Sequence, residues 1–275
     1  MLSSSPPDRW QGTQQRPTRV GLLLCGDVHD ALQSRFGDYS QCLVKRLRLD
    51  NPGAEFRTWR AWQGELPDDV RDADAYLVSG SPASVFDREH WIERLGSFIR
   101  RAHSAHRRLL GICFGHQMIH QALGGRVERA AGWGLGIYPV HLYQRIAGLP
   151  DSRPVALYAM HRDQVVTPAE GFELLGGSDF CPYYLMRHTD RVLTIQGHPE
   201  FTGDFFHQFL KVAESKFDEK ALAGARRKLQ EADDGDTTCQ LLNHFLLGFR
   251  KTGLPELPPC RQSLKIRGNG GLETE

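Results

Sequence analysis

The hydrophobic pattern of the chain changes abruptly at one residue, Cys113. The apolar run RLLGI at 108–112 is typical of a buried strand, whereas residues 114–123 repeat apolar side chains at helical spacing until Gly124. A buried strand that turns directly into a helix is the repeating unit of a parallel sheet covered by helices. This segment therefore predicts an α/β fold with Cys113 at a strand end.

Other segments repeat this alternation of strands and helices. Because helical patterns separate some of the apolar runs, we expect a parallel sheet with helices on both faces. Predicted strands are 19–25, 54–59, 75–80 and 108–112, and predicted helices are 38–49 and 88–106. The middle runs GLGIYPVHLY, PVALYAMH, GFELLGGS and RVLTIQGH predict strands that extend the sheet or pair as antiparallel ribbons, and FFHQFLKVAESKF and TTCQLLNHFLLGF after Thr202 predict helices.

The boundaries of the folded body follow from composition. With 275 residues, 40% of them hydrophobic, the chain can bury a sizeable core. Residues 1–17 are rich in Ser, Pro, Gln and Arg, and residues 251–275 are polar and rich in glycine near their end. We expect one domain over 18–250 between a flexible N-terminal segment and a flexible C-terminal tail.

Charge and cysteine content narrow the functional classes. Lys plus Arg number 34 and Asp plus Glu 33, a net charge of +1, which favours neither nucleic acid nor an anionic membrane as partner. The start has no signal-peptide pattern and no apolar run is long enough to cross a bilayer. The cysteines form no C-x-x-C pair, so we expect neither a disulfide framework nor a zinc site, and a cytoplasmic location. They are Cys25, Cys42, Cys113, Cys181, Cys239 and Cys260.

Cys113 is a candidate nucleophile. Together with Gly111 and Gly115 it forms G-x-C-x-G, the cysteine version of the elbow that presents a nucleophile at the edge of a sheet. The N-terminus of the following helix also favours a thiolate. A buried structural cysteine is the alternative, and the pattern alone does not decide between them.

A thiolate nucleophile needs an imidazole that accepts and returns a proton, and a carboxylate that orients it. The sequence offers His198 and Glu200, which follow the predicted strand VLTIQ. Because the carboxyl ends of parallel strands share one crevice, His198 is expected to reach Cys113. Taken singly, each of the two residues is more often a solvated surface residue.

Attack on a carbonyl also needs donors for the oxyanion. The turn after the strand at 75–80 carries Gly80 and Ser81, whose backbone N–H groups are candidates, and the Phe114 N–H follows the nucleophile directly. An ordinary loop is the alternative for the Gly80 turn.

The segments SGSP, GICFGHQ and QGHPEF, in this order and at these separations, resemble the class I glutamine amidotransferase family over most of residues 19–215. The resemblance implies a flavodoxin-like three-layer α/β/α sandwich with a mostly parallel central sheet. It also implies a cysteine that attacks the side-chain amide of glutamine through a γ-glutamyl thioester. On that basis Cys113 is the nucleophile, His198 the general base and acid, and Glu200 the orienting carboxylate, while Gln117 helps to hold the glutamyl group.

The chain is similar in particular to stand-alone family members without an ATP-pyrophosphatase domain, including plant γ-glutamyl peptidases. MHRDQV at 160–165 and AGWGLGIYPV at 131–140 carry this likeness. In this group the H-x-D segment lines the crevice, which makes His161 and Asp163 substrate-binding candidates, although Asp163 as a turn cap is equally physical. Two positions depart from the pattern: Ser81 replaces a glycine, and Gly134 stands where an acidic residue is expected.

The sequence is compatible with three functions. The leading hypothesis is a cysteine-dependent hydrolase of γ-glutamyl amide bonds, in small peptides or in glutamine, with a small-molecule substrate and no cofactor. The alternatives are a glutaminase that supplies nitrogen to a separate synthase partner, and a non-catalytic regulatory member of the fold.

Two further sets of residues are interpreted neither as metal ligands nor as pocket walls. His116 and His120 stand at i and i+4, but no third ligand is in phase and no metal site is expected. His116 is expected near the mouth of the crevice and His120 on the surface. Trp133 is expected to be a buried anchor rather than a pocket wall.

Overall fold

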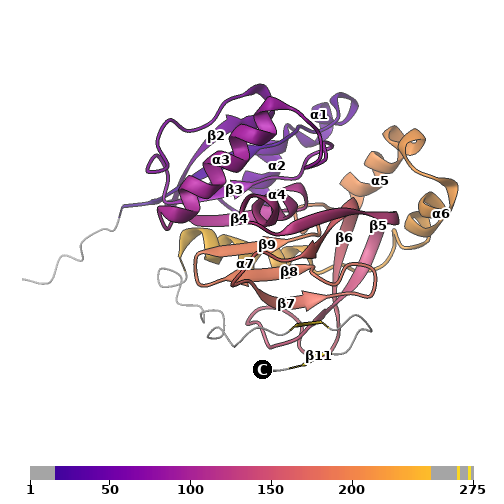
Figure 1. Cartoon of the computed structure of the whole chain (residues 1–275). Coiled ribbons are helices and arrows are strands. Elements are labelled where there is room, and N and C mark those ends of the chain that lie inside the picture. The colour runs from indigo at the N-terminus through magenta and orange to yellow at the C-terminus, as the bar shows by residue number, and fades with distance from the viewer. Residues whose placement is uncertain (1–15, 249–264, 267–271, 274–275) are drawn as a thin grey trace, which may run out of the picture.

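The computed structural model describes residues 16–248, together with 265–266 and 272–273 (Figure 1). Most of the two segments expected to be flexible, 1–17 and 251–275, lies outside the described residues. No helix within the described ranges combines the length and the apolar character that crossing a bilayer requires.

The described residues form a nine-stranded mixed sheet with the order β2-β1-β3-β4-β9-β8-β7-β5-β6. Neighbouring strands are parallel from β2 to β9 and antiparallel from β9 to β6. The strands are β1 (Thr18–Leu24), β2 (Ala54–Arg60), β3 (Ala75–Val78), β4 (Arg108–Ile112), β5 (Arg126–Leu142), β6 (Val155–Thr167), β7 (Glu173–Gly177), β8 (Leu185–His188) and β9 (Val192–Ile195). A separate antiparallel pair joins β10 (Lys265–Ile266) to β11 (Leu272–Glu273).

Helices cover both faces of the parallel half, which confirms the predicted α/β fold (Figure 1). The helices are α1 (Asp30–Phe36), α2 (Tyr39–Arg46), α3 (His90–Ser104), α4 (Phe114–Ala122), α5 (Gly203–Val212), α6 (Glu219–Arg227) and α7 (Gly235–Leu247), with short 3₁₀ turns at Ala61–Gln63 and Glu214–Lys216. The patterns predicted α2, α3, α4, α5 and α7, but α1 and α6 fell in segments without a clear helical stripe.

The two apolar layers are built by the alternation of side chains along each strand. In β1, Leu22 and Leu24 belong to the cluster that contains α2 and α7. Leu23 faces the other way, into the cluster formed with α3 and α4. The sheet is therefore the middle of three layers, with a buried core on each side.

The antiparallel half carries a third, smaller core. The long strands β5 and β6 pair with each other, and α5 and α6 lie beside them (Figure 1). Leu135 of β5 and Tyr158 of β6 pack with Phe206 and Leu210 of α5 and with Leu222 of α6. This core fixes α5 next to the carboxyl end of β9, where the predicted catalytic residues lie.

Candidate active site

Cys113 occupies a strained turn between β4 and α4. Its φ is 52° and its ψ is −105°, a backbone conformation that residues other than glycine rarely adopt. The Cys113 N–H donates to the carbonyl of Ile195 on β9 (2.8 Å), and the Cys113 carbonyl accepts from the Gln117 N–H (3.1 Å). Hydrogen bonds on both sides hold the predicted elbow in this conformation.

The two glycines of the elbow are required by close approach. A Cβ at Gly111 would lie 2.6 Å from the Gly115 carbonyl oxygen. A Cβ at Gly115 would overlap the Val78 carbonyl oxygen on β3. The helix after Cys113 can therefore start directly against the sheet only because neither position carries a side chain.

His198 and Glu200 follow β9, the strand next to β4, and both side chains are buried. His198 Nδ1 lies 2.7 Å from Glu200 Oε1, and the ring of Phe201 stacks on the imidazole with 4.2 Å between centroids. Tyr39 of α2 donates its hydroxyl to the same Glu200 Oε1, also at 2.7 Å. Glu200 therefore holds one edge of the imidazole, and Phe201 packs against its face. The other ring nitrogen, Nε2, has no hydrogen-bond partner among the described residues.

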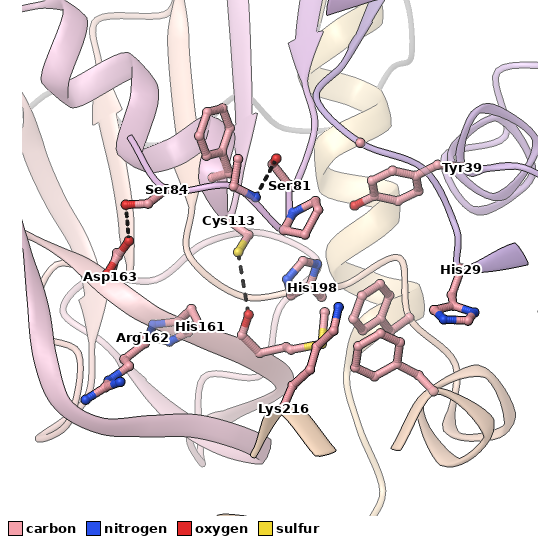
Figure 2. A pocket seen from close by; sticks show the side chains of 18 of the residues that line it. His29, Tyr39, Ser81, Ser84, Cys113, His161, Arg162, Asp163, His198 and Lys216 are labelled. Atoms are coloured by element: carbon pink, nitrogen blue, oxygen red, sulfur yellow. Dashed lines mark hydrogen bonds between the residues drawn. The ribbon is translucent and has the colours of Figure 1, made fainter. Parts of the chain in front are cut away.

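Cys113 and His198 point into the same cavity, of about 480 Å³ (Figure 2). A Cβ at Gly80 would lie 3.0 Å from His198 Cε1 and 3.8 Å from Cys113 Cβ, so Gly80 keeps this meeting point free of side-chain atoms. The thiol lies 3.9 Å from the Met160 carbonyl oxygen, and the Gln196 amide lies 3.7 Å from the sulfur.

The charges of this cluster favour a protonated imidazole. Burial on its own would lower the pKa of His198. The negative charges of Cys113 and Glu200 act in the opposite direction and raise the pKa of His198 to about 10. The geometry is thus suited to a thiolate beside an imidazolium ion.

Two residues whose backbone N–H groups are candidate donors line this cavity from different elements. Neither the N–H of Ser81 nor that of Phe114 has a hydrogen-bond acceptor among the described residues. Gly80 differs, because the Tyr39 hydroxyl crowds it: a Cβ at Gly80 would lie 3.0 Å from that oxygen, and the Gly80 backbone opposes the strong rise that burial and Glu200 cause in the Tyr39 pKa. Ser81 and Phe114 are therefore better placed than Gly80 to bind an oxyanion.

His161 and Asp163 lie on the opposite side of Cys113 from Tyr39 (Figure 2), and both line the cavity together with Gln117. The Gln117 amide nitrogen donates to the Asp163 carbonyl (2.6 Å) and to the Gln196 amide oxygen (3.3 Å), which leaves the Gln117 oxygen as an acceptor. Burial lowers the pKa of His161 to about 3, so its imidazole is neutral.

The Asp163 carboxylate is not a turn cap. It accepts a hydrogen bond of 2.5 Å from the Ser84 hydroxyl and pairs with Arg129 Nε at 2.9 Å. The pairing register of β5 and β6 explains this contact, because Arg129 stands directly opposite Asp163 in the ladder. The register then shifts between Arg129 and Gly134, where four residues of β5 stand against one of β6, and this irregular part of β5 places Trp133 at the cavity.

Comparison with known proteins identifies the family of this chain. The family model described as glutamine amidotransferase class-I matches residues 36–211, more than half of the 275-residue chain. The chain belongs to the class I glutamine amidotransferase family. Gamma-glutamyl peptidase 2 of Arabidopsis thaliana is 28% identical over 242 residues, which cover 84% of this chain and 97% of the plant protein.

The chain is also similar to a glutamine-hydrolysing synthase and to a solved amidotransferase structure. The glutamine-hydrolysing GMP synthase of Thermosipho africanus is 31% identical over 171 residues, which cover 61% of this chain and 32% of the synthase. The crystal structure of a glutamine amidotransferase from Methylobacillus flagellatus has a TM-score of 0.65 at 17% identity and covers 88% of this chain and 96% of its own. This likeness confirms the fold expected of an amidotransferase domain.

The two departures of this family member have local explanations. Ser81 has no positive φ, so the turn needs no glycine there. Its hydroxyl donates to the Cys25 carbonyl (2.6 Å) and accepts from the Ala83 N–H (3.0 Å), which fixes the turn. A Cβ at Gly134 would lie 2.7 Å from the Phe180 ring and 3.0 Å from His161 Nε2, so a side chain there would displace His161.

Three expectations about individual residues were wrong. His116 and His120 are fully buried in α4 and neither lines the cavity. His120 accepts from the Ala169 N–H (3.2 Å) and lies against the Phe172 ring, so tertiary packing covers a helix face that looked exposed in the sequence. Trp133, expected to be a buried anchor, instead lines the cavity from the irregular part of β5.

The sequence patterns also missed part of the cavity wall. Tyr39 lies at the N-terminus of α2, where its position in the sequence is that of an ordinary helix residue. Phe205 and Phe209 stand out in the sequence only as helix-spaced apolar residues, yet both line the cavity together with Lys216. The four-residue spacing of the two phenylalanines is a signal that they share one helix face, but it does not say which surface that face meets.

Proposed function

We propose that the chain is a cysteine-dependent hydrolase of γ-glutamyl amide bonds in small molecules. The observation that carries this proposal is the buried His198–Glu200 pair, 2.7 Å apart, beside the thiol of Cys113. Two N–H groups without acceptors among the described residues, those of Ser81 and Phe114, lie at the same cavity. The family and the peptidase relatives support the choice of a γ-glutamyl bond.

The proposed reaction proceeds in two halves. The Cys113 thiolate attacks the γ-carbonyl carbon, and the N–H groups of Ser81 and Phe114 stabilise the oxyanion. The C–N bond then breaks while His198 transfers its proton to the leaving nitrogen, and a γ-glutamyl thioester remains. Water attacks the thioester and gives one proton to His198, the C–S bond breaks, and glutamate leaves.

Other groups are assigned to binding and orientation. Glu200 holds the imidazole through Nδ1, so that Nε2 faces the sulfur. The free oxygen of Gln117 is suited to accept from the α-ammonium group of the glutamyl moiety. His161 and Asp163 shape the same side of the cavity.

The test is release of glutamate from γ-glutamyl dipeptides and from glutamine by the purified protein. We expect cysteine-dependent release, with Cys113→Ala inactive and Cys42→Ser, at a half-buried thiol outside the cavity, fully active. An electrophilic glutamine analogue should label Cys113, as identified by peptide mass spectrometry. Equal rates for wild type and Cys113→Ala would exclude the mechanism.

A second candidate function is supply of ammonia to a separate synthase. The likeness to a glutamine-hydrolysing GMP synthase favours it. Stimulation of glutamine hydrolysis by a co-purifying synthase, with little cleavage of dipeptides, would select this alternative.

The same proposal includes a cytoplasmic location. Five of the cysteines, all within the described part of the chain, are free thiols, as a reducing compartment would keep them. Fractionation of cells expressing a tagged chain tests this.

A further inference from the structure

The position of His198 defines where a leaving group must lie, provided that the proposed hydrolysis is correct. The leaving nitrogen takes its proton from His198, so the amine must leave on the His198 side of the Cys113 sulfur. The glutamyl moiety then extends to the other side of Cys113, toward Asp163, which lies across the cavity from His198 (Figure 2).

The His198 side of the cavity is lined by aromatic rings that follow one another outward. Phe201 stacks on His198. The ring centroid of Phe205 lies 4.8 Å from that of Phe201, and the ring centroid of Phe209 lies 6.4 Å from that of Phe205. Phe217 continues the series 6.4 Å from Phe209, and Trp133 lies 4.8 Å from Phe217 in an edge-on arrangement. We call this series the aromatic run: Phe201, Phe205, Phe209, Phe217 and Trp133, all of which line the cavity.

One cation accompanies the aromatic run. Lys216 extends into the cavity toward His198 (Figure 2). Its ammonium group forms no ion pair within the described part of the chain, whereas the nearby Glu214 is paired with Arg226. By contrast, Arg129 on the glutamyl side is already paired with Asp163. Lys216 is therefore available to bind an anion on a ligand.

We propose that the His198 side of the cavity is a subsite for an α-amino acid with an aromatic side chain, so that the preferred substrates are γ-glutamyl derivatives of aromatic amino acids. The ring of the leaving amino acid packs against the aromatic run, and its carboxylate meets Lys216. Aromatic pairs add stabilisation beyond the area they bury, which favours an aromatic over an aliphatic occupant.

The substrate series tests both contacts separately. γ-Glutamyl-phenylalanine carries ring and carboxylate, γ-glutamyl-phenethylamide carries only the ring, and γ-glutamyl-glycine carries only the carboxylate. We expect kcat/KM for γ-glutamyl-phenylalanine to exceed that for the glycine dipeptide by roughly tenfold to a hundredfold. Equal kcat/KM for these two substrates would overturn the proposal.

Matched variants assign the contacts to residues. Lys216→Gln should lower kcat/KM for γ-glutamyl-phenylalanine and leave γ-glutamyl-phenethylamide unchanged, while Lys211→Gln, at an exposed position of α5 outside the cavity, should change neither. Phe209→Ala should reduce the preference for the ring, while Phe56→Leu, at an exposed position of β2, should not. An equal effect of Lys216→Gln on both ring-bearing substrates would contradict the assigned carboxylate contact.

A binding experiment separates this proposal from the hydrolase itself. Calorimetry with the Cys113→Ala protein measures affinity for the same three compounds without turnover. Tighter binding of γ-glutamyl-phenylalanine than of γ-glutamyl-glycine supports the subsite even if the wild type cleaves neither, a result that would remove only the proposed hydrolysis. Equal affinities would overturn the subsite even if both compounds are cleaved.

Discussion

The Tyr39 hydroxyl lies 2.7 Å from Glu200 Oε1, the carboxylate oxygen that also holds His198. Tyr39 comes from the first turn of α2 and Glu200 from the segment after β9, so the contact joins elements 161 residues apart. Because Glu200 Oε2 has no partner within the described residues, Oε1 carries all the hydrogen bonds of this buried carboxylate. Tyr39 is therefore a positioning residue for the proposed catalytic pair.

Tyr39→Phe should lower kcat in the proposed hydrolase by roughly tenfold, because a hydrogen bond to a charged buried group is lost. The substitution keeps the ring, so the melting temperature should change little. Tyr143→Phe, which removes a hydroxyl outside the cavity, serves as the control. A merely structural role for Tyr39 would lower stability and leave kcat and its pH profile unchanged.

The pKa of His198 predicts the alkaline limit of activity. Burial lowers this pKa, but Cys113 and Glu200 raise it to about 10. A raised pKa keeps the imidazolium protonated to higher pH, so the proton needed by the leaving group is present below about pH 10 and is lost above it. We expect the alkaline limb of kcat/KM near that pH.

Glu200→Gln should move this alkaline limb to lower pH, because one of the charges that raise the pKa of His198 is removed. The full pH profile of kcat/KM, measured on both proteins with circular dichroism as a check of folding, decides the point. An unchanged limb in Glu200→Gln would show that another group controls the alkaline side.

Gly80→Ala should abolish most of the activity without unfolding the chain. The new Cβ would lie 3.0 Å from both His198 Cε1 and the Tyr39 hydroxyl, so it would push apart groups that must meet. We expect a loss of at least about a hundredfold in kcat/KM, since small misplacements of reacting groups have effects of this size. Gly132→Ala, where a Cβ would contact nothing within 4 Å, should retain full activity.

Gly115→Ala should act on stability instead. Its Cβ would overlap the Val78 carbonyl oxygen, so α4 would have to move away from β3, at a cost of about 2–3 kcal/mol. Gly224→Ala, in the middle of α6 with no atom closer than 3.9 Å, should stabilise the protein by about 0.5–1 kcal/mol. Urea unfolding of both variants tests whether the two substitutions change the free energy of unfolding in opposite directions. Equal midpoints would contradict the packing argument.

Local patterns predicted the parts of the site that local geometry controls. The strand before Cys113 and the glycines around it determine the elbow, and the end of β9 determines where His198 and Glu200 begin. The register of two adjacent parallel strands then brings them together, since Ile112 pairs with Ile195. Both segments were therefore visible as strand ends in the sequence.

Residues contributed by packing could not be predicted in this way. The burial of His120 depends on Ala169 and Phe172, which lie in the segment between β6 and β7. Lys216 reaches the cavity because a 3₁₀ turn interrupts the predicted helix after Val212. The position of Lys216 depends on the docking of α5 against β5 and β6, which no periodicity in the sequence reveals.

The two halves of the mixed sheet hold different parts of the candidate site. Cys113 and His198 follow strands of the parallel half, whereas Trp133 belongs to the antiparallel half and Phe209 and Lys216 belong to the segment packed beside it. In the proposed hydrolase, selectivity could therefore be redesigned by exchanging side chains along α5, its 3₁₀ turn and the irregular part of β5, while Cys113 and His198 keep the elements that hold them. In evolutionary terms, a lineage with this architecture can change the amine it releases through substitutions that leave the elbow untouched.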